Sequence, residues 1–171
     1  MNRRYFMMGS AAAAGMLRPG ALSSANDTVR IGCVGLNGRG MDHIRAFSGV
    51  SNVEIAALCD IDQAVMAKGV QALAKAGKKA PATFVDIRKL LEDKSIDAIS
   101  IATPNHWHTL MTIWGCQAGK DVYCEKPCSH NMFESQQIVA AAAKYKRIVQ
   151  QGSQGRSSPA VQEASRRSRR D

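Results

Sequence analysis

The sequence is poor in aromatic residues and has no long uninterrupted apolar run. Aromatic side chains make up 5% of the 171 residues, and they are not interleaved with basic ones, which argues against a base-stacking surface for nucleic acid. The apolar stretch at 9–17 is far shorter than the ~20 residues that a membrane-spanning helix needs. We therefore expect neither nucleic acid nor a membrane as a partner of the folded domain.

The net charge of +9 does not change this expectation, because it is concentrated at the two ends of the chain. Arginines near the N-terminus contribute +3 and the segment 166–171 another +3, so the remaining body carries only about +3.

The five cysteines show no second Cys or His pair with zinc spacing. This pattern disfavours a structural metal or a disulfide framework, and we predict no metal site. Cys128 lies beside the candidate site described below, although inert packing is the preferred interpretation even there.

Residues 1–25 resemble a twin-arginine export signal. Arg3 and Arg4 precede the apolar stretch, and a small-residue site at 23–25 comes just before Asn26. This route exports proteins that have already folded, so we expect a periplasmic or secreted location. A disordered basic N-terminus is the alternative.

Apolar strands alternate with helical patterns through residues 26–151. Strands are expected at 29–34, 53–59, 83–85, 98–102, 121–124 and 148–150. This alternation predicts an α/β fold with a doubly wound parallel sheet, the Rossmann fold. Over 152–171 we expect a loop, a short helical start at 160–164 and a disordered basic tail. No second domain is predicted.

Residues 35–40 form a glycine-rich turn directly after the first predicted strand. An open α/β sheet binds a dinucleotide pyrophosphate at such a turn, because glycines allow close approach and the next helix presents free amides. Asparagine stands where the usual fingerprint has its middle glycine, and we expect it to tolerate a left-handed conformation there. The candidate phosphate-binding residues are Gly35, Asn37, Gly38, Arg39 and Gly40.

Asp60 lies 20 residues beyond Gly40, at the end of the second predicted strand. A carboxylate there accepts hydrogen bonds from ribose hydroxyls and repels a 2′-phosphate, which favours NAD over NADP. Two alternatives stay open. Asp60 or Asp62 could cap the next helix, and Arg39 could pair with the phosphate of NADP.

Two further polar loops follow the fourth and fifth predicted strands. The first is residues 103–108 (TPNHWH), and the second is residues 125–127 (EKP). Both should lie at the carboxyl edge of the sheet, where ligands of such sheets bind. Near a nicotinamide, Lys126 could orient a substrate hydroxyl or move its proton, although spacing alone favours a surface ion pair with Glu125. His106 and His108 do not form a strong metal pattern.

In their order, these motifs resemble those of the Gfo/Idh/MocA oxidoreductases over about residues 28–159. The Pro-Asn-x-x-His loop followed by Glu-Lys-Pro is the most specific part. The resemblance implies that the glycine turn holds the pyrophosphate, that Asp60 binds the adenosine ribose, and that Lys126, often followed by a cis proline bond, is the catalytic residue. It places on the nicotinamide side the residues Thr103, Pro104, Asn105, His108 and Glu125.

The resemblance also implies hydride transfer between NAD and a sugar or polyol. Exported members of the family include glycosidases that act by transient oxidation with retained NAD, which is a second interpretation. The family's second α/β domain, which carries a catalytic histidine and acid, is not found here. We therefore expect a truncated or frameshifted chain without the usual oligomer, and a non-catalytic nucleotide-binding fragment is the third interpretation.

Overall fold

The computed structural model describes residues 28–168, so the predicted signal at 1–25 lies outside the described residues. Within 28–168, no helix is both long and apolar enough to cross a membrane. Up to the sixth strand the elements are β1 (Val29–Val34), α2 (Arg39–Ser48), β2 (Val53–Cys59), α3 (Gln63–Lys75), β3 (Ala82–Phe84), α4 (Ile87–Glu92), β4 (Ala98–Ile101), α5 (Asn105–Gln117), β5 (Asp121–Cys124), α6 (Met132–Tyr145) and β6 (Val149–Gln151).

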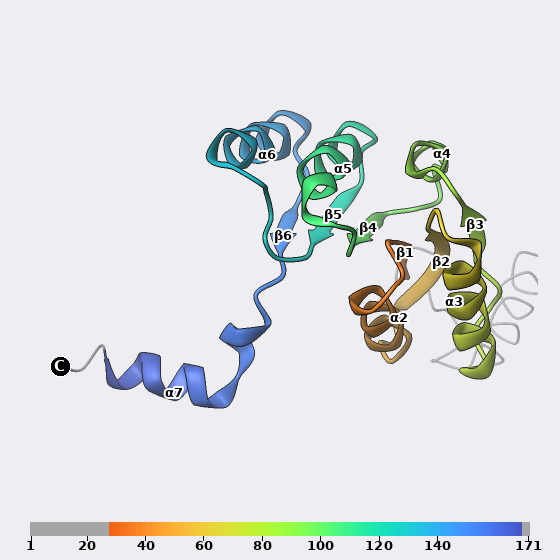
Figure 1. The fold of residues 1–171 in the computed structure, drawn as a ribbon, viewed down its shortest axis with the longest axis horizontal. Helices are drawn as coiled ribbons and strands as arrows, with labels where there is room; N and C mark the ends of the chain where they lie inside the picture. The colour runs from red at the N-terminus through yellow and green to blue at the C-terminus, as the bar shows by residue number, and fades with distance from the viewer. Residues whose placement is uncertain (1–27, 169–171) are drawn as a thin grey trace, which may run out of the picture.

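The six strands form one parallel sheet in the order β3-β2-β1-β4-β5-β6. This order confirms the predicted doubly wound Rossmann fold. The strand order reverses between β1 and β4, which opens a crevice at the carboxyl ends of those two strands. Helices α2 and α3 lie on one face of the sheet, and α4, α5 and α6 lie on the other (Figure 1).

Each face of the sheet has its own apolar core. Under α2 and α3, the fully buried side chains include Ile44 and Leu73. Under α4 and α5, they include Leu90 and Cys116. Burying one such leucine or isoleucine contributes about 1.5–3 kcal/mol, so the two cores hold the helices against the sheet.

The strand register aligns the carboxyl ends of the strands in one row. Val34 pairs with Cys59 on one side and with Ile101 on the other. Ile101 pairs in turn with Cys124, and Cys124 with Gln151. The residues that directly follow these strands therefore share one edge of the sheet, although they are far apart in the sequence.

The C-terminal segment differs from the expected loop and disordered tail. It contains a short 3-10 helix, η2 (Gln154–Ser157), and a helix, α7 (Pro159–Arg167), which extends three residues beyond the predicted helical start. Proline is favoured in the first helical turn, and Glu163 pairs with Arg167 at 3.0 Å, one turn further on. Both effects favour a helix here. Figure 1 shows that α7 projects away from the sheet.

Candidate functional site

The glycine turn between β1 and α2 has two left-handed residues, Gly35 (φ 76°) and Gly38 (φ 53°). The turn is formed with asparagine in the middle, but Asn37 does not use a left-handed conformation. The positive φ falls on Gly38 instead, which explains why a side chain is tolerated at position 37. At Gly40 any Cβ would overlap the carbonyl oxygen of Gly35. Helix α2 starts at Arg39 without a side-chain cap, so its first turn can receive an anionic group.

The glycine turn touches the loop after β4. A Cβ at Gly35 would lie 2.8 Å from the backbone nitrogen of Thr103. Only glycine permits this approach, and it brings the two loops together where the strand order reverses. The glycine turn and the loop after β4, which were predicted to share one edge of the sheet, are therefore in direct contact.

Asp60 is bonded to the glycine turn. Its carboxylate accepts hydrogen bonds from the backbone N–H of Leu36 at 2.7 Å and of Asp62 at 2.9 Å. The cap of α3 is Asp62, which accepts from the backbone N–H of Ala64 and Val65. The alternative left open by the sequence is thus resolved: Asp62 caps the helix, and Asp60 faces the site.

A cleft of about 560 Å³ opens beside Asp60. It is mostly apolar, and Trp107 and Trp114 of α5 line it with their ring centroids 6.4 Å apart. Asp86 also lines it and pairs with Arg88 at 2.5 Å, which lowers the pKa of Asp86 to about 2. The remaining lining residues include Gly35, Ile61, Val85, Thr103, Pro104 and Met111. Its size and apolar walls suit the adenosine end of a dinucleotide.

Glu125, directly after β5, is a buried carboxylate with four donors. Its Oε1 accepts from Arg39 Nε at 2.9 Å, His43 Nε2 at 3.0 Å and Gln154 Nε2 at 2.5 Å. Its Oε2 accepts from the backbone N–H of Lys126 at 3.2 Å. Burial raises the pKa of Glu125, but the hydrogen bonds from Arg39 and His43 outweigh it and hold the pKa at about 2.

A smaller hollow of about 180 Å³ lies beside Glu125 and is lined by Arg39, Thr103, His108 and Lys126 among others. The Lys126 side chain is exposed there, and its peptide bond to Pro127 is cis. Glu125 pairs with Arg39 and bonds only the backbone of Lys126 among the described contacts. The predicted surface ion pair is therefore not formed.

His108 is buried between the two polar loops. Its Nε2 lies 2.8 Å from the carbonyl oxygen of Thr103, and its Nδ1 lies 2.5 Å from that of Pro127. The ring thus ties the loop after β4 to the loop after β5. His106 is exposed and packs against Trp107, with ring centroids 6.0 Å apart.

The structure does not bring every candidate residue to these two clefts. Gly35, Asp60, Thr103 and Pro104 line the larger cleft, and Thr103, Arg39, His108, Glu125 and Lys126 line the smaller one. Four candidates line neither: Asn37, Gly38, Gly40 and Asn105. The three turn residues act through the backbone conformation, whereas Asn105 opens α5 with an exposed side chain.

Sequence reasoning missed His43, Ser100 and Gln154, which all belong to the network around Glu125. His43 lies one helical turn after Arg39, a spacing that places both on one face of α2. That spacing was an available signal. Ser100 points inward from the apolar strand β4, and nothing in the sequence marked it as part of a site. Gln154 follows β6, and only the tertiary structure brings it to Glu125.

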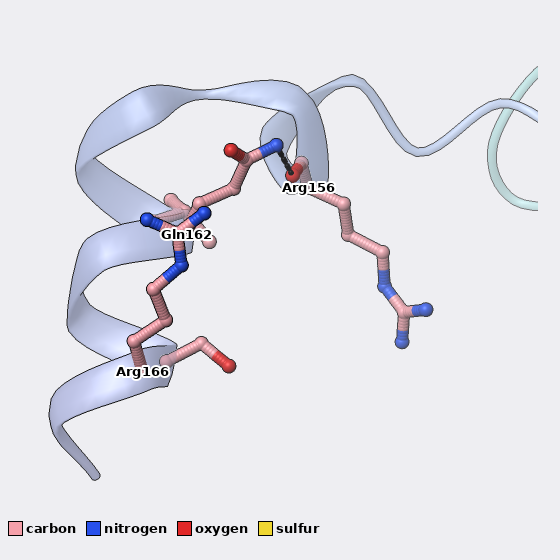
Figure 2. A pocket seen from close by; sticks show the side chains of 5 residues that line it. Arg156, Gln162 and Arg166 are labelled. Carbon is pink, nitrogen blue, oxygen red and sulfur yellow. Dashed lines mark hydrogen bonds between the residues drawn. The ribbon is translucent and has the colours of Figure 1, made fainter. Parts of the chain in front are cut away.

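A third hollow, between η2 and α7, has a volume of about 430 Å³ and is lined partly by Arg156, Gln162 and Arg166. In Figure 2 the Arg166 side chain runs back toward Gln162, whereas the Arg156 guanidinium points away from the helix. Gln162 donates to the Arg156 carbonyl oxygen at 3.3 Å. The two guanidinium groups do not converge on one point.

Over residues 28–168, no group of three or more His, Cys, Asp or Glu side chains is placed to hold a metal ion. All five cysteines are free thiols. Burial raises the pKa of Cys59, directly before Asp60, to about 12, which makes that thiol inert. Cys128 is half-buried, with its sulfur 3.9 Å from the Ser129 hydroxyl.

The glycine turn, the acid after β2 and the loops after β4 and β5 now stand at one sheet edge. The family model for Gfo/Idh/MocA, described as an oxidoreductase family with an NAD-binding Rossmann fold, matches residues 29–153. The chain belongs to this family. It corresponds to the family's NAD-binding domain.

Relatives and solved structures agree with this assignment. The chain is 33% identical over 129 residues to a Glycosyl hydrolase family 109 protein of Shewanella baltica and 32% identical to an alpha-N-acetylgalactosaminidase of Shewanella oneidensis. Each match covers 73% of this chain and 28% of the relative. The chain therefore spans less than a third of the length of these relatives.

Among solved structures, a myo-inositol 2-dehydrogenase from Lactobacillus plantarum matches with a TM-score of 0.71 and 26% identity, covering 80% of this chain and 40% of that one. An NAD binding oxidoreductase from Klebsiella pneumoniae matches with a TM-score of 0.68 and 31% identity, covering 80% of this chain and 37% of that one. A scyllo-inositol dehydrogenase from Lactobacillus casei, solved with NAD(H) and scyllo-inositol, shares the fold at 22% identity and a TM-score of 0.72, covering 80% of this chain and 39% of that one.

Proposed function

We propose that this domain binds NAD along the crevice, with adenosine in the larger cleft and nicotinamide toward the smaller one. The observation that carries the proposal is the Asp60 carboxylate, which faces the larger cleft while it holds the Leu36 amide of the glycine turn. The uncapped first turn of α2 would receive the pyrophosphate. These features fit the charge and shape of a dinucleotide.

We further propose that the cofactor is NAD rather than NADP. Two carboxylates, Asp60 and Asp86, line the larger cleft and would repel a 2′-phosphate. Arg88 also lines this cleft, but its guanidinium pairs with Asp86. The Arg39 guanidinium pairs with Glu125 beside the smaller cleft. The sequence left a phosphate role for Arg39 open, and its position beside Glu125 supports the NAD alternative.

For the reaction we propose hydride transfer involving a sugar or polyol. NAD, when bound, supplies the nicotinamide carbon that accepts or gives the hydride. Lys126 lines the smaller cleft with an exposed side chain and would hold or move the proton of the substrate hydroxyl. The inositol dehydrogenases among the structural neighbours support a polyol as the substrate class.

Glycoside hydrolysis is a second candidate, favoured by the 33% identity to a Glycosyl hydrolase family 109 protein. The two activities differ in their products. A panel of polyols and nitrophenyl glycosides distinguishes them. A dehydrogenase forms one NADH for each polyol that it oxidises, whereas a glycosidase releases free sugar with no net formation of NADH. A chain that binds NAD and does neither corresponds to the third interpretation, a non-catalytic nucleotide-binding fragment.

We also propose export through the twin-arginine route, on the basis of Arg3 and Arg4. Replacing both arginines by lysine should leave the chain in the cytoplasm, whereas the unmodified chain should be recovered from the periplasm with a new N-terminus near Asn26. Recovery of a chain that still starts at Met1 contradicts this proposal.

The binding proposal is tested by calorimetric titration of NAD and NADP into the unmodified chain and Asp60→Asn. We expect NAD to bind more tightly than NADP, and we expect the substitution to weaken NAD binding roughly 10- to 150-fold, because a hydrogen bond to a charged acceptor contributes roughly 1.5–3 kcal/mol. Glu92→Gln, an exposed carboxylate on α4 that lines neither cleft, is the control. Absence of NAD binding, or tighter binding of NADP, refutes the proposal.

A further inference from the structure

A buried chain of polar side chains links the middle of the sheet to Glu125. His43, on the inner face of α2, is 6% exposed, and Ser100 of β4 is 1% exposed. The His43 Nδ1 lies 2.7 Å from the Ser100 hydroxyl, and its Nε2 lies 3.0 Å from Glu125 Oε1. The proposed cofactor site does not itself require this histidine, which lines neither of the two clefts.

The chemistry of the neighbours fixes the direction of these hydrogen bonds. Arg39 donates to the same Oε1, and a guanidinium cannot accept, so Glu125 acts as a carboxylate acceptor. His43 Nε2 must therefore carry a proton to bond Oε1. In a neutral imidazole the other nitrogen, Nδ1, then accepts the Ser100 hydroxyl proton. One tautomer satisfies both contacts.

The far oxygen of Glu125 extends the chain to the catalytic candidate. Oε2 accepts the backbone N–H of Lys126 at 3.2 Å. The line thus runs from Ser100 through His43 and Glu125 to the Lys126 backbone. The ring of His43 is also held edge-on against Tyr123 and Phe47, with centroid distances of 5.4 and 6.1 Å, which leaves it little freedom to turn.

We propose that His43 is a positioning residue that orients the Glu125 carboxylate and, through it, the Arg39 side chain and the Lys126 backbone at the nicotinamide side of the site. The expected effect on NAD binding rests on the proposed function, whereas the orientation of the Glu125 carboxylate by His43 does not. The competing view is that His43 only fills space between α2 and β4. The two views differ in which nitrogen of the ring matters.

Two substitutions separate the ring nitrogens. The amide nitrogen of glutamine, a donor, is as many bonds from Cα as His43 Nε2, and the amide oxygen of asparagine, an acceptor, is as many bonds from Cα as Nδ1. His43→Gln can therefore keep the donor to Glu125 and lose the contact to Ser100, while His43→Asn does the reverse. Both substitutions shrink a buried side chain. A merely space-filling role therefore predicts the same Glu125 titration midpoint in both variants, and a somewhat larger loss of stability with the smaller asparagine.

The first measurement needs no cofactor. The Glu125 carboxyl is titrated by carbon NMR in the unmodified chain and in both variants, each checked for folding by amide dispersion. The charged or titratable groups that surround it are Arg39, His43, His108, Tyr123, Cys124 and Lys126. We expect the midpoint to rise by about one to two pH units in His43→Asn and to stay within about half a unit in His43→Gln. Equal midpoints in the two variants overturn the proposal.

The second measurement is NAD affinity by calorimetry. We expect His43→Asn to weaken NAD binding roughly 2- to 30-fold, the range for a residue that acts through another, and His43→Gln to restore most of it. An equal loss of NAD affinity in both variants, or no loss in either, overturns the inference that His43 affects NAD binding through Glu125. If the unmodified chain does not bind NAD, the proposed function fails, while the Glu125 titration still decides whether His43 positions the carboxylate.

Discussion

Removing the charge of Glu125 without changing its shape should weaken the fold at neutral pH and flatten its acid sensitivity. In Glu125→Gln the amide keeps one oxygen, which can still face Arg39 and His43. Its NH2 group must then face the Lys126 amide, so two donors meet where Oε2 now accepts. The substitution therefore removes charge assistance and leaves one backbone donor without a partner.

The magnitude follows from the lowered pKa. The pKa of Glu125 is about 2 in the folded chain, against about 4.3 for an unperturbed glutamate. A carboxyl with a depressed folded pKa stabilises the fold above its unfolded pKa, and that stability disappears as the pH falls toward the folded pKa. The difference corresponds to about 3 kcal/mol, present at pH 6 and lost progressively between about pH 4.5 and 2.

The assay is urea unfolding of the unmodified chain and Glu125→Gln at a series of pH values from 6 to about 3. Subtracting the two curves removes the titration of all other carboxyl groups. We expect a difference of about 3 kcal/mol at pH 6 that narrows as the pH falls. Glu92→Gln, whose exposed carboxylate pairs with Lys89 at 3.0 Å, should change stability by less than about 0.5 kcal/mol. Parallel curves for the unmodified chain and Glu125→Gln would refute the reasoning.

Three further predictions concern the turn, a helix cap and the thiols. Gly40→Ala should abolish measurable NAD binding and lower the melting temperature, because its Cβ would overlap the Gly35 carbonyl oxygen; unchanged calorimetry and melting would contradict this. Asp62→Ala should cost about 0.5–2 kcal/mol in urea unfolding, since Asp62 caps α3, whereas a larger loss of NAD affinity than of stability would assign it a binding role. In the native chain one thiol, that of Cys128, should react quickly with Ellman's reagent, and only urea should expose the four buried ones, Cys33, Cys59, Cys116 and Cys124; rapid reaction of two or more thiols contradicts the buried assignments.

Local patterns predicted the elements well. The central strands and the helices between them follow from apolar periodicity, because β1, β2 and β4 are largely buried and each of these helices buries one face. The edge strands β3 and β6 are mostly exposed and carry a weaker pattern. The tail was the exception. Its arginines suggested disorder, but Glu163 and Pro159 are enough to support α7.

The candidate site was predictable for residues that directly follow a predicted strand. Asp60 and Lys126 could be placed at the site edge because parallel strands end at one edge of the sheet, whatever their order. It was not predictable which of Asp60 and Asp62 caps α3 and which lines the cleft, since both precede the same helix. Which residue of the turn takes the positive φ was also not predictable, because the neighbouring Gly38, rather than Asn37 at the fingerprint position, takes it.

The sequence by itself determined the alternation of strands and helices, the glycine turn and the acid that follows β2, because these depend on residues close together in the chain. The tertiary structure decided what surrounds Glu125. Arg39 and His43 from α2, Ser100 from β4 and Gln154 from η2 meet there. Their meeting requires β1, β4, β5 and β6 to lie side by side in that order, and strand order depends on long-range packing that no local pattern encodes.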